Sequence, residues 1–283
     1  MWPKNFEYMR ASSAEEAVTL LSQNEEAKIL AGGHSLIPAL KLRLNEAPLL
    51  IDIGRVESLK SISANGTLRI GALATHAEIA ASPQVHGQAS ALAAAAGQVG
   101  DQSVRNFGTI GGNIAHADPA SDPPTVLAAY DASIHLQGPN GARAVNANDF
   151  FIDLFTTDLQ PDEIVTAVEI APQAGVQSAY VKLPHPASRY AVVGICVALQ
   201  MNGGTCQNAR VAVGGATVKA VRSPGAEAAL AGSALDANAL NAAANAVMED
   251  IAEYLIGDIT FPEDYRQAMA GVYLKRAIAQ AVG

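Results

Sequence analysis

The sequence predicts an α+β fold: a small βαβ lobe, a larger α+β lobe and then a C-terminal domain. Three observations support this prediction. Short apolar runs alternate with capped helical patterns over residues 1–55, and longer patterns of both kinds follow over residues 56–173. After a linker-like Ala-Pro-Gln-Ala-Gly at 171–175, three β-rich runs precede three helical patterns over residues 176–283. We therefore expect the C-terminal domain to combine a three-stranded antiparallel sheet with a helical bundle.

The first lobe is predicted to hold three strands and two helices. Ser13 and Glu16 have the spacing of a capping box, and apolar residues then recur at helical spacing as far as Leu21. Pro38 falls in the first turn of the second helical pattern, where proline is tolerated. The predicted order is strand 6–8, helix 13–21, strand 27–30, helix 35–44 and strand 49–53.

The same patterns continue through the rest of the chain. Thr75 and Glu78 form a second capping box, and Cys196 lies in an apolar run typical of a buried strand. In the second lobe we predict strands 68–73, 132–137 and 164–170, helices 75–81 and 88–99, a loop at 100–108, and a helix that ends at 130. In the C-terminal domain we predict strands 178–183, 190–201 and 209–213, a hairpin turn at 203–204, and helices 225–230, 237–255 and 262–281.

Two glycine segments carry the strongest functional signal. Residues 31–35 read AGGHS and residues 109–113 read TIGGN. Glycine permits positive φ and a close approach of the backbone to a ligand, and successive N–H groups can form a concave anion site. Neither segment contains Lys or Arg, so neutral dipoles would bind the phosphates, and two such turns could hold both halves of a pyrophosphate. Each pair alone could equally be a simple turn, and the spacing fits neither a Rossmann motif nor a P-loop.

Composition and cysteine count narrow the possible functions. A formal net charge of −9 argues against a nucleic-acid surface, because binding to a phosphate backbone requires clustered Lys and Arg. Cys196 and Cys206 are too few to ligate an iron–sulfur cluster and suit a reducing cytoplasm. The sequence offers no signal segment, membrane span or metal-ligand motif. With no Ser-His-Asp, HExxH or paired-carboxylate motif either, we predict no catalytic residue and no metal site.

Longer segments around these motifs resemble one known family. The stretch SVRNFGTIGGNIAHADPASD and the C-terminal GDITFPEDYRQAMAGVYLKRAI are similar to the FAD-binding medium subunits of molybdenum hydroxylases. That family includes carbon monoxide dehydrogenase and xanthine dehydrogenase. The resemblance covers essentially the full chain. It implies that the two N-terminal lobes form a non-covalent FAD-binding unit, and that the C-terminal part is a flavoprotein domain.

The resemblance also implies partners and a role. The molybdenum cofactor would lie on a large subunit, and a small subunit with two two-iron clusters would deliver electrons to this FAD. Flavin suits the role because it exchanges electrons singly and in pairs. The assembly would be a cytoplasmic dimer of heterotrimers that reduces an external acceptor.

A set of cofactor-binding residues follows from the same resemblance. The glycine segments would contact the pyrophosphate, Asp122 the ribityl hydroxyls, and Lys182 and Tyr190 the flavin ring. Simpler roles remain open: a helix N-cap for Asp122, a surface lysine for Lys182 and a strand tyrosine for Tyr190. The full set is Ala31, Gly32, Gly33, His34, Ser35, Leu36, Gly100, Val104, Thr109, Ile110, Gly111, Gly112, Asn113, Asp122, Ile164, Lys182 and Tyr190.

Three further residues have less defined roles. His34 is interpreted as part of its loop, and His116 as a solvated or hydrogen-bonded loop histidine. Arg105 would reach either a partner subunit or the adenylate.

Several functions remain open on the sequence alone. A carbon monoxide dehydrogenase-like complex is the first hypothesis, and an aldehyde or N-heterocycle hydroxylase is an alternative within the family. A stand-alone flavin oxidoreductase, either enolpyruvyl reductase-like or a covalent-flavin oxidase, would need its own substrate cavity and proton donor. A non-enzymatic nucleotide-binding scaffold is the third possibility.

Overall fold

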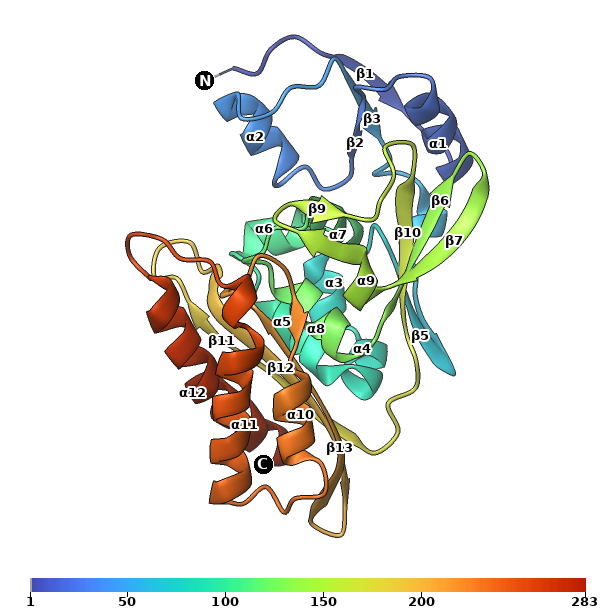
Figure 1. The fold of residues 1–283 in the computed structure, drawn as a ribbon. Coiled ribbons are helices and arrows are strands. Elements are labelled where there is room, and N and C mark those ends of the chain that lie inside the picture. The colour runs from blue at the N-terminus through green and yellow to red at the C-terminus, as the bar shows by residue number, and fades with distance from the viewer. Residues whose placement is uncertain (1) are drawn as a thin grey trace.

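The computed structural model describes residues 2–283 and contains one principal sheet in each of three successive parts of the chain. Figure 1 shows the first lobe at the top, the second lobe in the middle and the C-terminal unit at the lower left. The mixed α+β architecture predicted from the sequence is confirmed. Within the described residues, no helix is long and apolar enough to cross a membrane.

The first lobe is a parallel three-stranded sheet in the order β1-β3-β2. Its helix α1 buries an apolar face that includes Ala17 and Leu21 against Leu49 and Ile51 of the sheet. On the other face, Leu40 of α2 packs with Leu50. The elements are β1 (Glu7–Arg10), α1 (Ala14–Ser22), β2 (Lys28–Leu30), α2 (Leu36–Leu42) and β3 (Leu49–Asp52).

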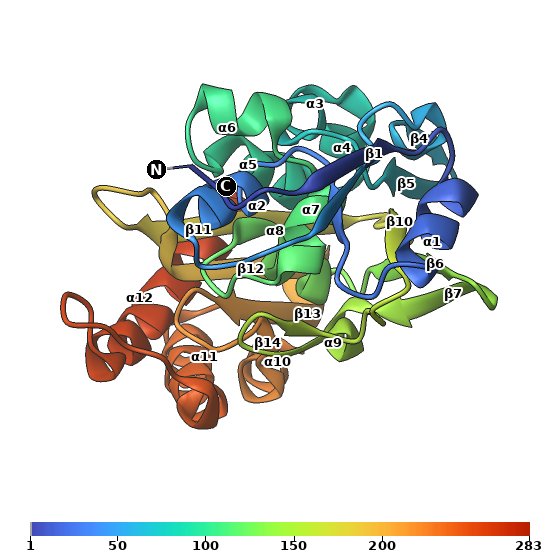
Figure 2. The ribbon, with the colours of Figure 1, turned by 90° about the horizontal axis from the view of Figure 1, so that it is seen from above.

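The second lobe is built on an antiparallel five-stranded sheet in the order β4-β5-β10-β6-β7. Short helices pack beside this sheet (Figures 1 and 2). The strands β8 and β9 form a separate small hairpin, and Figure 1 shows β9 beside α7. The strands are β4 (Ile62–Asn65), β5 (Thr67–Gly71), β6 (Ser133–Gly138), β7 (Gly141–Asn146), β8 (Phe151–Asp153), β9 (Thr156–Thr157) and β10 (Ile164–Ile170). The helices are η1 (Glu57–Leu59), α3 (His76–Ala81), α4 (Pro83–Gln88), α5 (Ser90–Gln98), α6 (Gln102–Phe107), α7 (Ile110–His116), α8 (Asp122–Ala129) and α9 (Ala147–Phe150).

The C-terminal unit is a four-stranded antiparallel sheet covered on both faces. One face carries helices α10, α11 and α12, and the other packs against α5 and α8 of the second lobe. This explains why the central strand has no polar alternation: residues 191–199 are all buried, including Cys196. The elements are β11 (Val176–Pro184), β12 (Ala191–Asn202), β13 (Thr205–Gly214), β14 (Val221–Arg222), α10 (Pro224–Leu230), α11 (Ala237–Asp250), η2 (Ala252–Tyr254) and α12 (Glu263–Val282).

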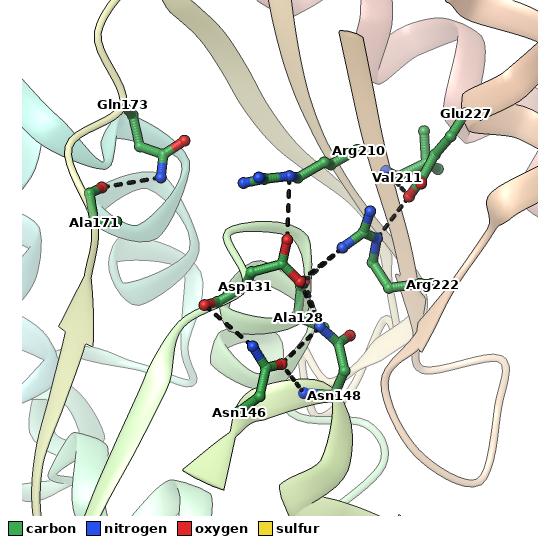
Figure 3. A network of polar contacts seen from close by, with 10 residues as sticks. All are labelled: Ala128, Asp131, Asn146, Asn148, Ala171, Gln173, Arg210, Val211, Arg222 and Glu227. Carbon is green, nitrogen blue, oxygen red and sulfur yellow. Dashed lines mark hydrogen bonds and ion pairs between the residues drawn. The ribbon is translucent and has the colours of Figure 1, made fainter. Parts of the chain in front are cut away.

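A polar network joins the C-terminal unit to the end of α8 (Figure 3). The Asp131 carboxylate accepts hydrogen bonds from Arg222 Nη1 at 3.0 Å and Asn148 Nδ2 at 2.8 Å, and it pairs with Arg210 Nε at 3.2 Å. Arg222 Nε also donates to Glu227 at 2.6 Å. Because both guanidinium groups share one carboxylate, the network fixes the sheet of the C-terminal unit relative to the second lobe.

Several sequence predictions require correction. The predicted helix 88–99 is α5, which begins at Ser90 because Ala89, with a ψ of 58°, is not helical, and the preceding helix α4 was not predicted. The predicted loop 100–108 contains helix α6, which Asp101 caps by accepting from Val104 N–H at 2.9 Å. The C-terminal sheet gains the short fourth strand β14.

Helix ends also differ from their predicted positions. The capping box at Thr75 is confirmed, whereas Glu16 accepts from Ser12 N–H rather than from Ser13 N–H. Helix α2 ends at Leu42 because Arg43 takes a left-handed φ of 60°. In the C-terminal unit, α11 ends at Asp250 and gives way to η2.

Candidate cofactor-binding site

The two glycine segments lie against each other. A Cβ added to Gly32 would stand 1.9 Å from the carbonyl oxygen of Phe107, and one added to Gly112 would stand 3.9 Å from Ala31 Cβ. The His34 ring stacks on the Phe107 ring with centroids 5.3 Å apart and planes 10° from parallel. Segments distant in the sequence thus form one surface, and Gly32 is required for the contact.

The first segment supplies backbone donors that the protein does not use. The N–H groups of residues 32–35 donate to no atom of residues 2–283. Gly33 has φ of 72°, and the His34 Nδ1–H donates to the Gly32 carbonyl at 3.0 Å, which closes the turn. Ser35 stands at the N-cap of α2 but makes no capping bond, so its hydroxyl is also free. The segment can therefore offer several uncharged donors to an anion.

The second segment is not the tight turn that the sequence predicted. Thr109 is the N-cap of α7, and Gly111 and Gly112 occupy the first turn of that helix. The N–H groups of Ile110 and Gly111 donate to the carbonyls of Ala74 and Ala72 at 3.0 and 2.8 Å. A Cβ on Gly111 would stand 2.5 Å from Ala72 Cβ. These backbone donors are therefore engaged within the protein, and the glycines serve close packing.

Side chains of the second segment still offer hydrogen-bond donors. Thr109 Oγ1 accepts from Gly112 N–H at 3.2 Å, which leaves the hydroxyl hydrogen for another acceptor. Asn113 Oδ1 accepts from Ser121 Oγ at 2.8 Å, and this bond turns the amide nitrogen of Asn113 into a free donor. Ser121 directly precedes Asp122, so this bond links the glycine segment to the start of α8.

Asp122 and Lys182 form a buried ion pair between the second lobe and the C-terminal unit. Lys182 Nζ lies 2.8 Å from Asp122 Oδ2 and donates to the Gln98 carbonyl at 3.0 Å, and Tyr180 Oη donates to Asp122 Oδ1 at 2.6 Å. The side chains of Asp122 and Lys182 are only 5% and 2% exposed. Burial raises the pKa of Asp122, and Lys182 and Tyr180 oppose that shift.

The structure excludes two of the simpler roles, a helix N-cap for Asp122 and a surface position for Lys182. Ser121 occupies the N-cap of α8 and Asp122 is the first helical residue, so Asp122 is not the cap. Lys182 is buried rather than on the surface. Sequence reasoning missed Tyr180, although it lies two residues before Lys182 on the same face of β11, a spacing that a strand's period of two makes visible.

Tyr190 lies at the end of the β11-β12 hairpin. Its carbonyl accepts from His185 N–H at 2.7 Å, and the preceding Arg189 has φ of 64°. The Tyr190 side chain is half exposed, and burial together with the Asp118 carboxylate raises the pKa of its phenol. Ala191 N–H donates to Ala120 O at 3.2 Å, so the hairpin is attached to the loop that leads to Asp122.

Other predicted residues serve the framework. Gly100 has φ of 44° and packs on Val104, and Arg105 Nη1 donates to the carbonyls of Val99 and Gly100 rather than reaching outward. Ile164 is 2% exposed within the apolar cluster of the first lobe, and Leu36 packs beside Leu40 on α2. Ile164 is therefore buried away from the exposed part of the site, whereas Leu36 is partly exposed directly after Ser35.

Two histidines complete the surroundings of α7. His116 is the last residue of the helix and contacts Phe155 with ring centroids 5.2 Å apart. His76 was not predicted to matter, yet it is buried beneath Gly108 and its Nδ1 has no hydrogen-bond partner. Over residues 2–283, no group of three His, Cys, Asp or Glu side chains is placed to hold a metal ion.

Comparison with known proteins identifies the class to which this fold belongs. Residues 4–173 match the FAD binding domain in molybdopterin dehydrogenase, and residues 178–281 match the CO dehydrogenase flavoprotein C-terminal domain. The chain therefore belongs to the family of FAD-binding subunits of molybdenum hydroxylases, which are oxidoreductases.

Individual relatives match over nearly the whole chain. The carbon monoxide dehydrogenase medium chain of Hydrogenophaga pseudoflava is 40% identical, with 99% of this chain and 98% of the relative covered. The glyceraldehyde dehydrogenase medium chain of Sulfolobus acidocaldarius is 37% identical over 94% of this chain and 92% of its own length. A solved structure of carbon monoxide dehydrogenase from Hydrogenophaga pseudoflava superposes with a TM-score of 0.95 at 40% identity, covering 100% of this chain and 99% of that one.

Proposed function

We propose that this chain is the FAD-containing electron-transfer subunit of a heteromeric molybdenum hydroxylase. It would take electrons from iron–sulfur clusters on a small partner subunit and pass them to an external acceptor, while substrate oxidation takes place on a large molybdenum-binding subunit. The observation that carries the proposal is the 40% identity to a carbon monoxide dehydrogenase medium chain over 99% of this chain. A carbon monoxide dehydrogenase is accordingly the complex we favour.

The donor set of the glycine segments fits FAD. A pyrophosphate is an anion with several acceptor oxygens, and the free N–H groups of residues 32–35 match that need without adding a cation. The hydroxyls of Ser35 and Thr109 and the amide of Asn113 extend the same surface. When bound, the flavin supplies chemistry that neither carboxylates nor amides have: it exchanges electrons singly and in pairs.

The buried pair would orient and polarise the cofactor. Each Asp122 oxygen already accepts one hydrogen bond, and its remaining lone pairs could accept from the ribityl hydroxyls. Lys182 would place positive charge near the flavin ring, and Tyr190, which is half exposed, would cover it. The protein thus contributes position and electrostatics rather than acid–base groups.

One experiment tests the role of the chain. It is co-expressed with the molybdenum-binding and iron–sulfur chains of its own complex, and the purified product is assayed for flavin, iron and molybdenum. We expect one FAD per copy of this chain, with iron and molybdenum in the same particle. Light scattering should give the mass of a dimer of heterotrimers, and fractionation should place the complex in the cytoplasm. A purified product that contains no FAD would refute the proposal.

The substrate is tested with the same preparation. Carbon monoxide should reduce an artificial electron acceptor, and the rate should exceed those with aldehydes or N-heterocycles. The 37% identity to a glyceraldehyde dehydrogenase medium chain supports an aldehyde as the second candidate. Faster turnover of glyceraldehyde than of carbon monoxide would replace the first assignment with the second.

A further inference from the structure

The hairpin between β8 and β9 carries an exposed apolar tip. Ile152, Leu154 and Phe155 are 48%, 47% and 54% exposed, although all three are large apolar residues. We call these three residues the hairpin tip. Figure 1 shows β9 on the same side of the molecule as α6 and α7, which carry the second glycine segment. Large apolar side chains gathered at one exposed point mark sites of protein–protein contact.

The backbone conformation at Phe155 is one that phenylalanine does not favour. Leu154 and Phe155 form the two-residue loop between the paired Asp153 and Thr156, and Phe155 has φ of 51°. Such loops favour Asn or Gly, whereas a bulky residue at positive φ is strained. A strained residue with an exposed side chain points to a role outside the folding of its own chain.

The tip is held in a defined position. The Phe155 ring contacts the His116 ring at the end of α7, with centroids 5.2 Å apart. Helix α7 carries the second glycine segment in its first turn and ends at His116, so the tip lies at the C-terminal end of that same short helix. A partner bound at the tip would therefore sit beside the proposed FAD site.

Charge indicates the chemistry of the partner. Residues 144–181 contain six acidic residues and no Lys, Arg or His. Asp158 and Glu163 are paired with Arg143. Asp149 precedes the tip by three residues and Asp153 lies within it; both are exposed and form no salt bridge with residues 2–283, although Lys219 lines the same small cavity as Asp153. An apolar centre with an acidic rim fits a surface with an apolar socket bordered by Lys or Arg.

We infer that the hairpin tip is an anchor that inserts into an apolar, basic-rimmed socket on a different chain of the assembly. Small clusters of large side chains commonly supply most of the energy of an interface, so three residues are enough for this role. The inference rests on the proposed function insofar as it requires a multi-chain complex, but it does not depend on the chemistry of the flavin.

The decisive variant is Phe155→Asn. Asparagine accepts positive φ, so the isolated chain should fold with an unchanged or higher melting temperature. Assembly with the molybdenum-binding and iron–sulfur chains should nevertheless weaken at least tenfold, as read by the dissociation constant, and Leu154→Ser should act in the same direction. Val272→Ser, which changes an exposed apolar residue on α12, is the matched control and should assemble as the unchanged chain does.

A photo-crosslinking amino acid at position 154 identifies the partner directly. In the assembled complex, position 154 should crosslink to a different chain, at an apolar segment bordered by Lys or Arg, and position 272 should not. Crosslinking of position 154 only to a second copy of this chain would overturn the inference, as would normal assembly of Phe155→Asn. Absence of any complex with the unchanged chain would overturn the proposed function as well, so the two failures are distinguishable.

Discussion

Gly32 illustrates how the absence of one methyl group sets the shape of the site. The carbonyl oxygen of Phe107 occupies the place where a Cβ would be, and this contact brings the free N–H groups of residues 32–35 beside α7. Gly33, with φ of 72°, then allows the chain to turn into α2. Close approach at Gly32 and positive φ at Gly33 are different requirements, and only glycine meets both.

We expect Gly32→Ala to impair FAD binding more than folding. The added methyl would stand 1.9 Å from Phe107 O, so the first segment must move away from α7. Overpacking of this kind costs about 1–3 kcal/mol, which corresponds to roughly a 5- to 150-fold rise in the FAD dissociation constant. The FAD dissociation constant is measured by titrating the complex with FAD and monitoring flavin fluorescence.

Gly87→Ala is the matched control for this prediction. No atom lies within 4 Å of an added Cβ at Gly87, which is in helix α4, so FAD affinity should not change. Stability should stay equal or rise by up to about 1 kcal/mol, because alanine favours helix. Equal FAD affinity in Gly32→Ala and the unchanged chain would show that the close approach at Gly32 does not shape the site.

His76 should make stability sensitive to acid. Burial, with a smaller effect of Arg105, lowers the pKa of His76 from 6.5 to about 4. The unfolded chain therefore binds a proton between pH 6.5 and 4 while the folded chain does not, so the stability from neutral His76 is full above pH 6.5 and is lost as the pH falls. Between pH 7 and 5 the loss should be about 2 kcal/mol.

Denaturant unfolding at the two pH values tests this expectation. His76→Leu should remove most of the acid sensitivity, whereas His86→Gln, which changes an exposed histidine, should retain it. An unchanged pH dependence in His76→Leu would show that other groups control the acid response.

At the scale of elements, sequence rules succeeded where local chemistry decided the outcome. The Thr75–Glu78 capping box starts α3 as predicted, and the apolar run around Cys196 forms a strand buried on both faces. Helix α6 was missed because it has six residues between two glycines, although Asp101 is a usable N-cap signal. Helix α7 was read as a turn because glycine is a poor helix former, and packing of Gly111 against Ala72 overrides that preference.

The candidate site was also predictable only where a local sequence pattern marks it. The two glycine segments stood out as motifs, and the structure places them in contact. No local pattern indicates that Phe107 O and the Gln98 carbonyl would complete the surroundings, since both act through the backbone. The engagement of the Gly111 N–H by Ala72 likewise depends on tertiary packing that sequence spacing does not contain.

Helix α12 should depend on Arg266 for its attachment to the sheet. Arg266 is 7% exposed and donates to Gly215 O at 2.7 Å, Val192 O at 3.2 Å and Phe261 O at 3.0 Å. Arg266→Lys keeps the charge but cannot reach all these carbonyls, and buried unpaired acceptors should lower the free energy of unfolding by about 2–4 kcal/mol. Chemical denaturation measures the change.

The same substitution at Arg276 serves as the control. Arg276 is exposed on α12 and lies over the Tyr273 ring at 4.6 Å, a contact that lysine can also make. Arg276→Lys should change stability by less than about 0.5 kcal/mol. Equal effects of the two substitutions would mean that the carbonyl bonds of Arg266 are not what attaches the helix.

At the scale of the whole molecule, two polar joints hold the C-terminal unit on the second lobe. The network around Asp131 is partly exposed, whereas the Asp122–Lys182 pair is buried beside the candidate site. Helix α8 lies between the two joints, and all of its residues are buried. Because residues of both units contribute to the candidate site, the geometry of the site depends on the two units staying fixed relative to each other.

The buried pair therefore gives the sharpest test of this arrangement. Lys182→Met should destabilise the chain by about 3–5 kcal/mol, because it leaves the Asp122 carboxylate buried without its cation. Asp122→Asn combined with Lys182→Met removes both charges, so the double variant should recover a large part of that loss. A double-mutant cycle by denaturant unfolding measures the coupling between the two residues. Additive losses would show that the pair does not join the units, whereas recovered stability with weak FAD binding would show that the same two residues serve both the joint and the cofactor.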